Sequence, residues 1–332
     1  MGLIFPASPK MNTSTTLRFY NYSLAMKEPV PVGGAMMSTR RGILVRAKDG
    51  DGNMGWGEAA PLDGFGTETI DGAVEAVRSG QVTPSLEFAV DCARRGMVAA
   101  KNGISFASSL GEMKRSCLKN VRLNPTESVR AGVSVKFKVG RNSVREDSDR
   151  LLNWMELNPE STVRLDANGL WRREDAVLFA DHVGARRERI EFIEEPWNGC
   201  FEVDNRADYP FRLAIDESLD SENWAHADMV ILKPSLLGAI QDVMSWARMI
   251  QDSGRSVVWS SAYESGVGMT VLVGIASRFD GPAVGFGTYG YLQGDVGGKI
   301  ASLEGDSICV ADLPALPGAH IDMRRLSEIH LT

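Results

Sequence analysis

Five charged side chains stand near the ends of five successive apolar stretches in the middle of the chain. They are two lysines and three carboxylates: Lys138, Asp166, Glu194, Asp216 and Lys233. Three carboxylates suit a hard divalent cation, here Mg²⁺ with Mn²⁺ as the alternative. A lysine beside a cation and a second ammonium group has its neutral form favoured, so it can accept a proton. The set therefore predicts metal-assisted removal of a proton next to the carboxylate of a small-molecule substrate.

The elements that must position these residues read as short parallel strands. From about residue 117, apolar stretches alternate with helical patterns, which is typical of βα units. We expect strands at residues 118–123, 133–139, 162–167, 190–195, 213–217, 229–233, 257–261 and 284–287. Eight short strands within roughly 170 residues favour a closed barrel over an open sheet.

Side-chain alternation directs the charged groups into this barrel. In the second expected strand, apolar residues take every other position, and Lys136 and Lys138 lie on the opposite face. Because the apolar face must lie under the helices, both lysines point inward. In the third expected strand, the same alternation points Arg164, Asp166 and Asn168 into the barrel.

The residues alone leave two choices of carboxylate open. Glu195 competes with Glu194, and Glu217 competes with Asp216, although alternation favours Glu194 and Asp216. A non-catalytic interpretation is that each acid caps a helix or pairs with Arg164 or a lysine. The lysines would then extend to solvent at the surface.

The N-terminal third has an α+β pattern. Strands are expected at 17–22, 42–47 and 55–58, with a turn at 48–52, and helices at 69–77 and 84–100. The tail after residue 299 is poor in helical pattern and is expected to fold back on the first domain. The predicted division is a capping domain over 1–112, a barrel over 113–298 and a tail over 299–332.

Composition narrows the class of protein. The net charge is −7 and no basic stretch offsets it, which argues against nucleic acid or an anionic membrane as partner. Four scattered cysteines without a C-x-x-C pair predict a reducing compartment, with neither a disulfide framework nor structural zinc. We find no apolar run long enough for a membrane span and no signal-peptide core, so we expect a cytoplasmic protein. The sequence leaves the oligomeric state open and fits a monomer.

Motifs around the five charged residues resemble those of the muconate-lactonizing subgroup of the enolase superfamily. These motifs are Lys136-Phe137-Lys138, Arg164-Leu165-Asp166-Ala167-Asn168, Ile193-Glu194-Glu195-Pro196, Ile215-Asp216-Glu217-Ser218 and Lys233-Pro234-Ser235. Within the subgroup the chain most resembles the o-succinylbenzoate synthases, on the segments at 55–65, 260–265 and 285–288. The resemblance spans about residues 38–290.

The resemblance implies a (β/α)7β TIM-like barrel under an α+β capping domain formed by the N-terminal region and the C-terminal tail. It implies syn dehydration of 2-succinyl-6-hydroxy-2,4-cyclohexadiene-1-carboxylate to 2-succinylbenzoate, a step toward menaquinone. Lys138 would take the α-proton and then protonate the departing hydroxyl, while Lys233 would stay cationic and stabilise the enediolate. The three carboxylates would hold the metal. Expected substrate contacts are Lys136, Arg164, Asn168, Phe65 of the cap, and main-chain groups near Ala262, Tyr263 and Gly285.

The nearest alternative is a racemase or epimerase acting on N-acylamino acids or dipeptides, because two flanking lysines also suit two-sided proton exchange. Dipeptide epimerases typically place Asp-x-Asp near the last barrel strand, and residues 285–290 contain no acid. This disfavours a dipeptide and leaves an N-succinylamino acid open. A non-catalytic binding barrel would be supported by loss of a lysine or ligand, and none is lost. Phosphate binding at 265–268 is the weakest alternative.

Overall fold

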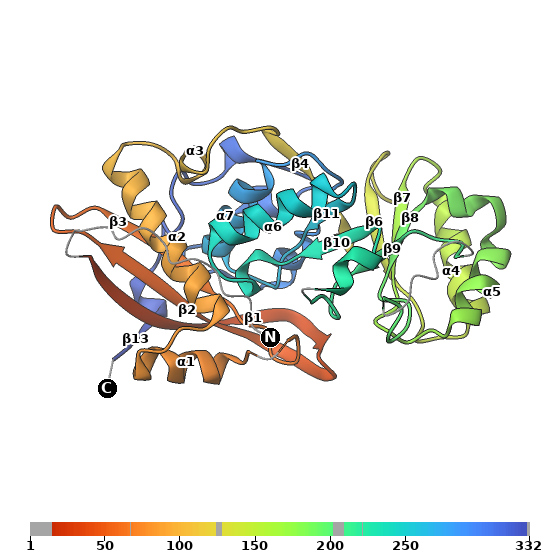
Figure 1. The fold of residues 1–332 in the computed structure, drawn as a ribbon, viewed down its shortest axis with the longest axis horizontal. Coiled ribbons are helices and arrows are strands. Elements are labelled where there is room, and N and C mark those ends of the chain that lie inside the picture. The colour runs from red at the N-terminus through yellow and green to blue at the C-terminus, as the bar shows by residue number, and fades with distance from the viewer. Residues whose placement is uncertain (1–14, 67, 124–127, 202–208, 221, 331–332) are drawn as a thin grey trace.

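Two β-sheets of different kinds organise the chain. The computed structural model describes residues 15–66, 68–123, 128–201, 209–220 and 222–330. One sheet is antiparallel with strand order β13-β1-β2-β3, and the other is parallel with order β11-β10-β9-β8-β7-β6-β5. Figure 1 shows the antiparallel sheet with its helices at one end of the molecule and the parallel sheet at the other.

The antiparallel sheet is a long hairpin extended on both sides. Its strands are β1 (Thr16–Val32), β2 (Ala35–Lys48), β3 (Met54–Ala59) and β13 (Ser327–Ile329). The β1–β2 turn holds Gly33 and Gly34 at φ 54° and 82°, which is the pair of positive φ values that a tight hairpin favours. Near the other end of the chain, β13 pairs with β1, with Phe19 opposite Ile329. The tail thus returns to the first sheet, while the domain limits themselves stay a prediction.

Each face of this sheet packs against a different partner. The odd-numbered residues of β2, including Ile43 and Val45, form one apolar cluster with α1 (Ile70–Ser79) and α2 (Pro84–Lys101). Leu44, whose side chain points to the other face, belongs to the larger cluster that continues into the barrel. The alternation of side chains along a strand therefore joins the sheet to both neighbours.

The parallel sheet is curled into a barrel. Its strands are β5 (Arg122–Leu123), β6 (Ser134–Lys138), β7 (Thr162–Asp166), β8 (Ile190–Glu194), β9 (Leu213–Ile215), β10 (Met229–Leu232) and β11 (Ser256–Trp259). The eighth expected strand is reduced to two parallel bridges, from Val284 to Asn120 and from Gly285 to Ser260. These bridges connect the two edges of the sheet. The predicted TIM-like barrel with an α+β cap is confirmed.

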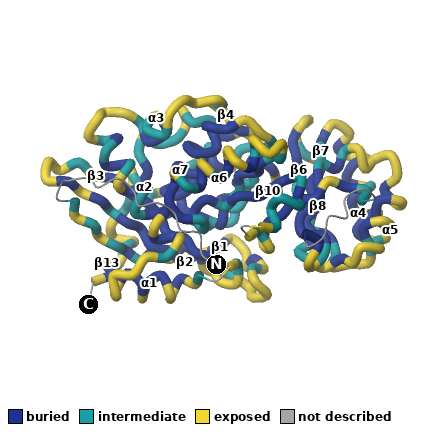
Figure 2. Tube along the Cα trace, viewed as in Figure 1, coloured by how far each residue is buried: buried dark blue, intermediate teal, exposed yellow. Residues whose placement is uncertain are grey.

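The longer helices α4 (Val144–Leu157), α5 (Arg173–Val183), α6 (Ile240–Asp252) and α7 (Gly266–Ala276) follow barrel strands, and the short α3 (Phe106–Ser109) packs against α2 and α7. The connections contain the 3₁₀ turns η1 (Gly184–Arg189), η3 (Asn223–His226), η4 (Pro234–Leu236) and η5 (Gly287–Tyr291), and the tail contains η6 (Ala301–Glu304), η7 (Val310–Asp312) and η8 (Met323–Arg325). Every residue of α7 is buried, so it is a core helix at the junction with the cap. Figure 2 shows the barrel strands buried and the outer turns of α4 and α5 exposed.

One expectation fails in this fold. A two-stranded sheet pairs β4 (Cys117–Lys119) with β12 (Ser307–Cys309), and it places Cys117 opposite Cys309. The two form a disulfide across a sequence separation of 192 residues. The prediction of a chain without disulfide bonding is wrong at this pair, because no short-range spacing can reveal a contact made by two remote strands.

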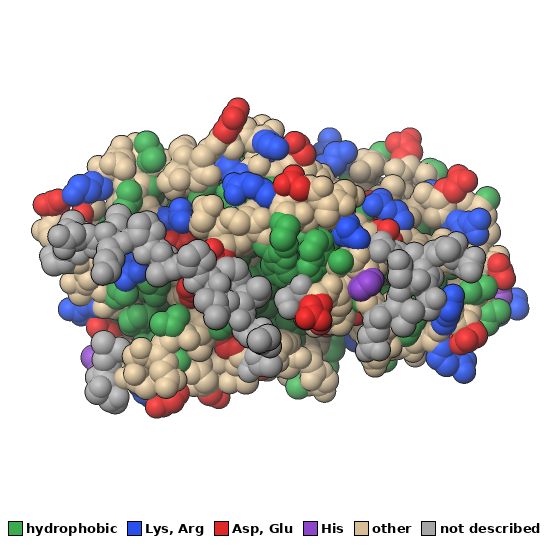
Figure 3. Space-filling model, viewed as in Figure 1, with side chains coloured by type: hydrophobic (Ala, Val, Ile, Leu, Met, Phe, Trp, Pro, Cys, Tyr) green, Lys and Arg blue, Asp and Glu red, His purple; other side chains and the backbone are tan. Residues whose placement is uncertain are grey.

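The surface and the helices bear on the kind of partner. On the face drawn in Figure 3, positive and negative side chains are interspersed, and no single-sign stripe is seen among the described residues there. In the described ranges, none of the helices combines the length and the apolar content that a membrane crossing requires.

Candidate active site

Strand register brings the predicted site residues to one end of the barrel. Lys138 pairs with Asp166, and Asp166 pairs with Glu194 across the next strand. Glu194 in turn pairs with Ala214, so Asp216 lies two residues further along on the same face. The interior below them is filled by an apolar cluster of Phe192, Ala214, Met229, Ile231 and Val258. The charged residues at the strand ends therefore lie above a packed apolar barrel interior.

The lysines and carboxylates contact one another directly. Lys136 Nζ lies 2.7 Å from Asp166 Oδ2 and also contacts Glu194 Oε2. Lys138 Nζ lies 2.6 Å from the same Asp166 oxygen. On the other side Lys233 Nζ contacts Asp216 Oδ1, with only 11% of its side chain exposed. The pairing of acids with lysines that the non-catalytic interpretation describes is present, but here it joins acids from three strands in one cluster.

Lysine contacts lower the pKa of one acid of this cluster, while burial and repulsion raise that of another. Burial disfavours ionisation of Asp166, but the charges and hydrogen bonds of Lys136 and Lys138 outweigh it and lower its pKa. Burial raises the pKa of Glu194 to about 7, and the charges of Asp166 and Asp216 add to the rise. The three carboxylates thus lie near enough to repel one another strongly.

The structure gives the competing glutamates different partners. The Glu195 carboxylate accepts hydrogen bonds from the Asp216 N–H at 2.7 Å and the Ser218 N–H at 3.0 Å. It therefore fixes the backbone at the end of β9. Glu217 accepts from Asn168 Nδ2 at 2.7 Å, and burial followed by the charge of Asp216 raises its pKa to about 8. Glu217 is a further acid of the cluster.

The donor set fits a divalent cation, although the cluster is closed by lysines. Among the described residues, no group of three histidine, cysteine or acidic side chains is arranged around one point, because ammonium groups lie between the acids. Asp166, Glu194 and Asp216 are nevertheless 1%, 3% and 7% exposed, and all their oxygens are hard ligands. Burial lowers the pKa of Lys136, but all three carboxylates act on it and raise it well above its usual value.

Of two other predicted substrate contacts, Asn168 lies in the cluster and Arg164 lies deeper in the barrel wall. Asn168 accepts from Lys138 Nζ at 2.7 Å and lies in the cluster, held at a positive φ of 45°. Arg164 is 1% exposed and donates to Glu191 at 2.7 Å and to the Ala283 carbonyl at 2.9 Å. The guanidinium of Arg164 is therefore bound inside the barrel wall.

The loops expected over the substrate also have internal partners. The Ala262 N–H donates to Glu264 at 2.6 Å, and the Gly285 carbonyl accepts from the Ser261 N–H at 3.2 Å. The Phe65 ring lies over Lys233, with 3.9 Å from Nζ to the ring centroid. Phe65 thus brings a cap residue to the edge of the cluster.

Sequence reasoning missed a buried polar group at the junction of cap and barrel. Its members are Tyr22, Arg40 and Glu58 from the cap with Glu264 and Ser265 from the barrel, all under 10% exposed. Glu58 and Glu264 fall inside the segments that carry the resemblance, which was the available signal. Arg40 lies outside those segments and stands beside Arg41, and the sequence alone does not single out one arginine of the pair.

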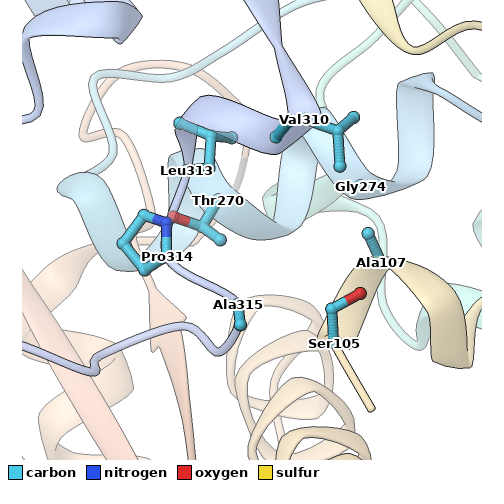
Figure 4. A pocket seen from close by; sticks show the side chains of 9 residues that line it. Ser105, Ala107, Thr270, Gly274, Val310, Leu313, Pro314 and Ala315 are labelled. Carbon is cyan, nitrogen blue, oxygen red and sulfur yellow. The ribbon is translucent and has the colours of Figure 1, made fainter.

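A separate cavity lies away from these charges. It has a volume of about 210 Å³ and is enclosed by α3, α7 and the tail at Leu313–Ala315. Figure 4 shows small and apolar side chains around it, such as Ala107 and Pro314. None of its lining residues is ionisable, so it offers no acid, base or metal ligand.

Two parts of the chain match two different protein families. Residues 14–97 match the family described as MenC, N-terminal domain, and residues 127–285 match the enolase C-terminal domain-like family. An o-succinylbenzoate synthase of Yersinia pseudotuberculosis is 30% identical over 302 residues, covering 85% of this chain and 92% of the relative. One of Haemophilus influenzae is 28% identical over 292 residues, covering 80% of this chain and 86% of the relative.

Solved structures agree on the fold. N-succinyl Arg/Lys racemase from Bacillus cereus superposes with a TM-score of 0.78 at 17% identity, covering 96% of this chain and all of that one. An o-succinylbenzoate synthase from Thermosynechococcus elongatus, complexed with Mg in its active site, gives 0.61 at 20% identity, covering 82% and 93%. At such identities these likenesses support the architecture alone.

Proposed function

The chain belongs to the o-succinylbenzoate synthase family of the enolase superfamily, and from this premise we propose that it dehydrates 2-succinyl-6-hydroxy-2,4-cyclohexadiene-1-carboxylate to 2-succinylbenzoate. The chain is accordingly an enzyme, a carbon–oxygen hydro-lyase. The proposal includes dependence on Mg²⁺ or Mn²⁺, a role in menaquinone biosynthesis and the cytoplasmic location that the sequence predicts.

One observation carries the proposal. Three lysines and the carboxylates of three neighbouring strands converge on one buried cluster at the barrel end. The three strands thus bring the hard oxygen ligands of Asp166, Glu194 and Asp216 together beside lysines that can move a proton. Glu217 is a fourth acid there, and burial followed by the charge of Asp216 raises its pKa to about 8.

The proposed chemistry uses the two outer lysines. Neutral Lys138 takes the proton from the carbon next to the substrate carboxylate, and the C–H electrons move into an enediolate. The C–O bond then breaks, and the same Nζ returns its proton to the leaving hydroxide to form water. Asp166 and Asn168 hold Lys138 in reach, with 2.6 and 2.7 Å contacts. Lys233 stays cationic opposite and stabilises the developing negative charge.

The metal would be held by Asp166, Glu194 and Asp216. A bound divalent cation supplies a Lewis acid beside the substrate carboxylate. For these residues to hold it, the Lys136 ammonium must leave its contacts with Asp166 and Glu194. Because burial raises the pKa of Glu194 to about 7, we expect metal binding to be weaker below that pH, where the carboxyl is protonated.

The test is turnover by the purified protein with Mg²⁺, with Mn²⁺ and after chelation. We expect dehydration only with metal, and loss of at least about 1,000-fold in kcat for Lys138→Ala, since general base catalysis alone contributes about 10² to 10⁴. Lys101→Ala is the matched control, because this exposed lysine pairs with Asp51 far from the cluster. Turnover by Lys138→Ala at the rate of the unchanged protein would refute the assignment of the base.

Racemisation of N-succinylamino acids is measured in parallel. Lysines on both sides of the cluster permit two-sided proton exchange, which is the specific feature that favours this second candidate. Racemisation without dehydration would replace the proposed reaction while keeping the same metal site.

A further inference from the structure

One buried arginine of the cap is bonded to two active-site loops at once. Arg40 lies on the barrel-facing side of β2 and is 3% exposed. Its Nη1 donates to the Pro61 carbonyl at 2.7 Å, and its Nη2 donates to the Ala60 carbonyl. Its Nε donates to the Tyr263 carbonyl at 3.2 Å. Only an arginine presents donors in a fork wide enough for these three acceptors.

The first loop, residues 60–66, is the Phe65 loop. It follows β3 directly, and the Phe65 N–H donates to the Leu62 carbonyl at 2.8 Å, which closes a turn. This turn sets the Phe65 ring over the Lys233 ammonium at 3.9 Å. Arg40 therefore holds the stem of a loop whose tip reaches a proposed catalytic lysine.

The second loop, residues 260–265, is the Tyr263 loop. Tyr263 has a φ of 62°, a conformation that non-glycine residues keep only where surroundings fix it. The next residue, Glu264, accepts from the Ala262 N–H at 2.6 Å and from Ser235 Oγ, two residues after Lys233. Arg40 is therefore linked through the Tyr263 loop to Ser235, which lies next to Lys233 in the chain, as well as to the Phe65 loop.

Charge balance keeps the guanidinium at this place. Glu58 and Glu264, both fully buried, are the acids of the surrounding group. The charge of Arg40 lowers the pKa of Glu264 against the larger effect of burial, which raises it. Burial without these acids would leave the cation uncompensated. The Arg40 guanidinium donates to neutral carbonyl groups and not to a carboxylate, so its hydrogen bonds hold the two loops in position.

We propose that Arg40 is a positioning residue, which fixes the Phe65 loop and the Tyr263 loop relative to each other and so sets how tightly the substrate tail is held. This inference rests on the proposed function for the identity of the substrate. The linkage of the two loops does not depend on it. Asp166 and Asn168, which contact Lys138, lie at the end of β7 and outside both loops, so we expect a change at Arg40 to act mainly on substrate binding.

The experiment compares Arg40→Met and Arg40→Lys with Arg46→Met. Arg46 lies on the same strand and face, but it stacks within the cap, 5.5 Å from the Tyr20 ring centroid and 5.7 Å from that of Trp56. We expect Arg40→Met to lower kcat/KM by about 100-fold, mostly through KM, since small misplacements of positioning groups cost about this much. Arg40→Lys keeps the charge on one nitrogen and regains only part of the loss. Arg46→Met stays within about threefold.

Hydrogen exchange gives a readout that does not require turnover. In Arg40→Met the amides of the Phe65 loop and the Tyr263 loop should both exchange faster, and in Arg46→Met neither should. A variant that merely unfolded more readily would lose active enzyme, and therefore apparent kcat, with KM unchanged. Unchanged KM, faster exchange in one loop only, or an equal effect of Arg46→Met would each overturn the inference. If the unchanged protein fails to dehydrate the substrate, the proposed function falls and the exchange comparison still decides the role of Arg40.

Discussion

At the scale of single residues, the same buried acid can stabilise the fold through hydrogen bonds and weaken it through charge. Glu58 is fully buried in the junction between β3 and α7. It accepts from the Ser265 N–H and the Gly268 N–H, both at 2.8 Å, and so caps the N-terminus of α7 from another domain. Burial raises its pKa above the usual 4.5, and hydrogen bonds from Ser265 and Tyr22 reduce the rise.

This balance predicts how Glu58 contributes to stability as pH changes. Because the pKa is higher in the folded state, Glu58 contributes most below about pH 4.5, and the contribution falls as pH rises through the folded pKa. We expect Glu58→Gln to destabilise by about 1–3 kcal/mol, since the amide leaves N–H groups unsatisfied. The gap in melting temperature between the two proteins should be larger at pH 5 than at pH 8. A gap that widens toward pH 8 would contradict the raised pKa.

At the scale of elements, the cap depends on an unusually close approach of a helix to a strand. A Cβ built on Gly57 would lie 1.9 Å from the Ala89 carbonyl oxygen of α2, and one on Gly55 would lie 2.2 Å from that of Ala93. Both obstacles are backbone atoms, which cannot rotate away. The two glycines of β3 thus let α2 lie directly on the sheet.

Gly57→Ala should therefore force α2 away from β3. We expect a loss of about 1–3 kcal/mol or more in the free energy of unfolding, as for other overpacked sites. Gly290→Ala is the control, because its Cβ would meet no atom within 4 Å and its φ is not positive. Chemical denaturation measures both, and a Gly57→Ala protein as stable as the Gly290→Ala protein would show that the approach is looser than described.

The elements also show where sequence reasoning reached and where it stopped. Barrel strands were predictable because one buried face gives regular alternation, and their inward charges followed from it. The hairpin was underestimated, since Lys27, Glu28 and two prolines break the alternation of β1 and a register shift lies between Ala25 and Val30. The Gly33-Gly34 turn was the available signal. The last barrel strand was overestimated, because its apolar run pairs only through two bridges.

At the scale of the whole molecule, contacts between remote segments escape any local pattern. The carboxylates could be predicted from the sequence, because each ends its own strand and parallel strands bring their ends together. Arg40 could not be predicted, because its partners Ala60 and Tyr263 are main-chain acceptors, which any residue offers. The pairing of Cys117 with Cys309 depends on two strands 192 residues apart. The sequence thus predicts features that follow from the pattern of a single strand, but not contacts between residues that come from remote segments.

At the scale of the whole molecule, the proposed metal site predicts that a divalent cation stabilises the fold. Buried acids that repel one another should gain from a divalent cation, and a ligand at 100 times its dissociation constant stabilises by about 2.7 kcal/mol. We expect the melting temperature to rise by about 5 °C with saturating Mg²⁺ and to return after chelation. Asp166→Asn should abolish this rise, because it removes a ligand that two lysines now contact.

A second buried acid separates this effect from a general response to salt. Asp295 is 2% exposed and accepts from the Gly266 N–H at 3.0 Å and from the Tyr289 hydroxyl at 2.6 Å, outside the cluster. Asp295→Asn should lower the starting melting temperature and keep the full Mg²⁺ response, since its carboxylate faces α7 and not the lysines. If both asparagine variants lost the response equally, Mg²⁺ would be acting on the fold at large. If only Asp166→Asn lost it, the barrel end would be the metal site, whatever the substrate.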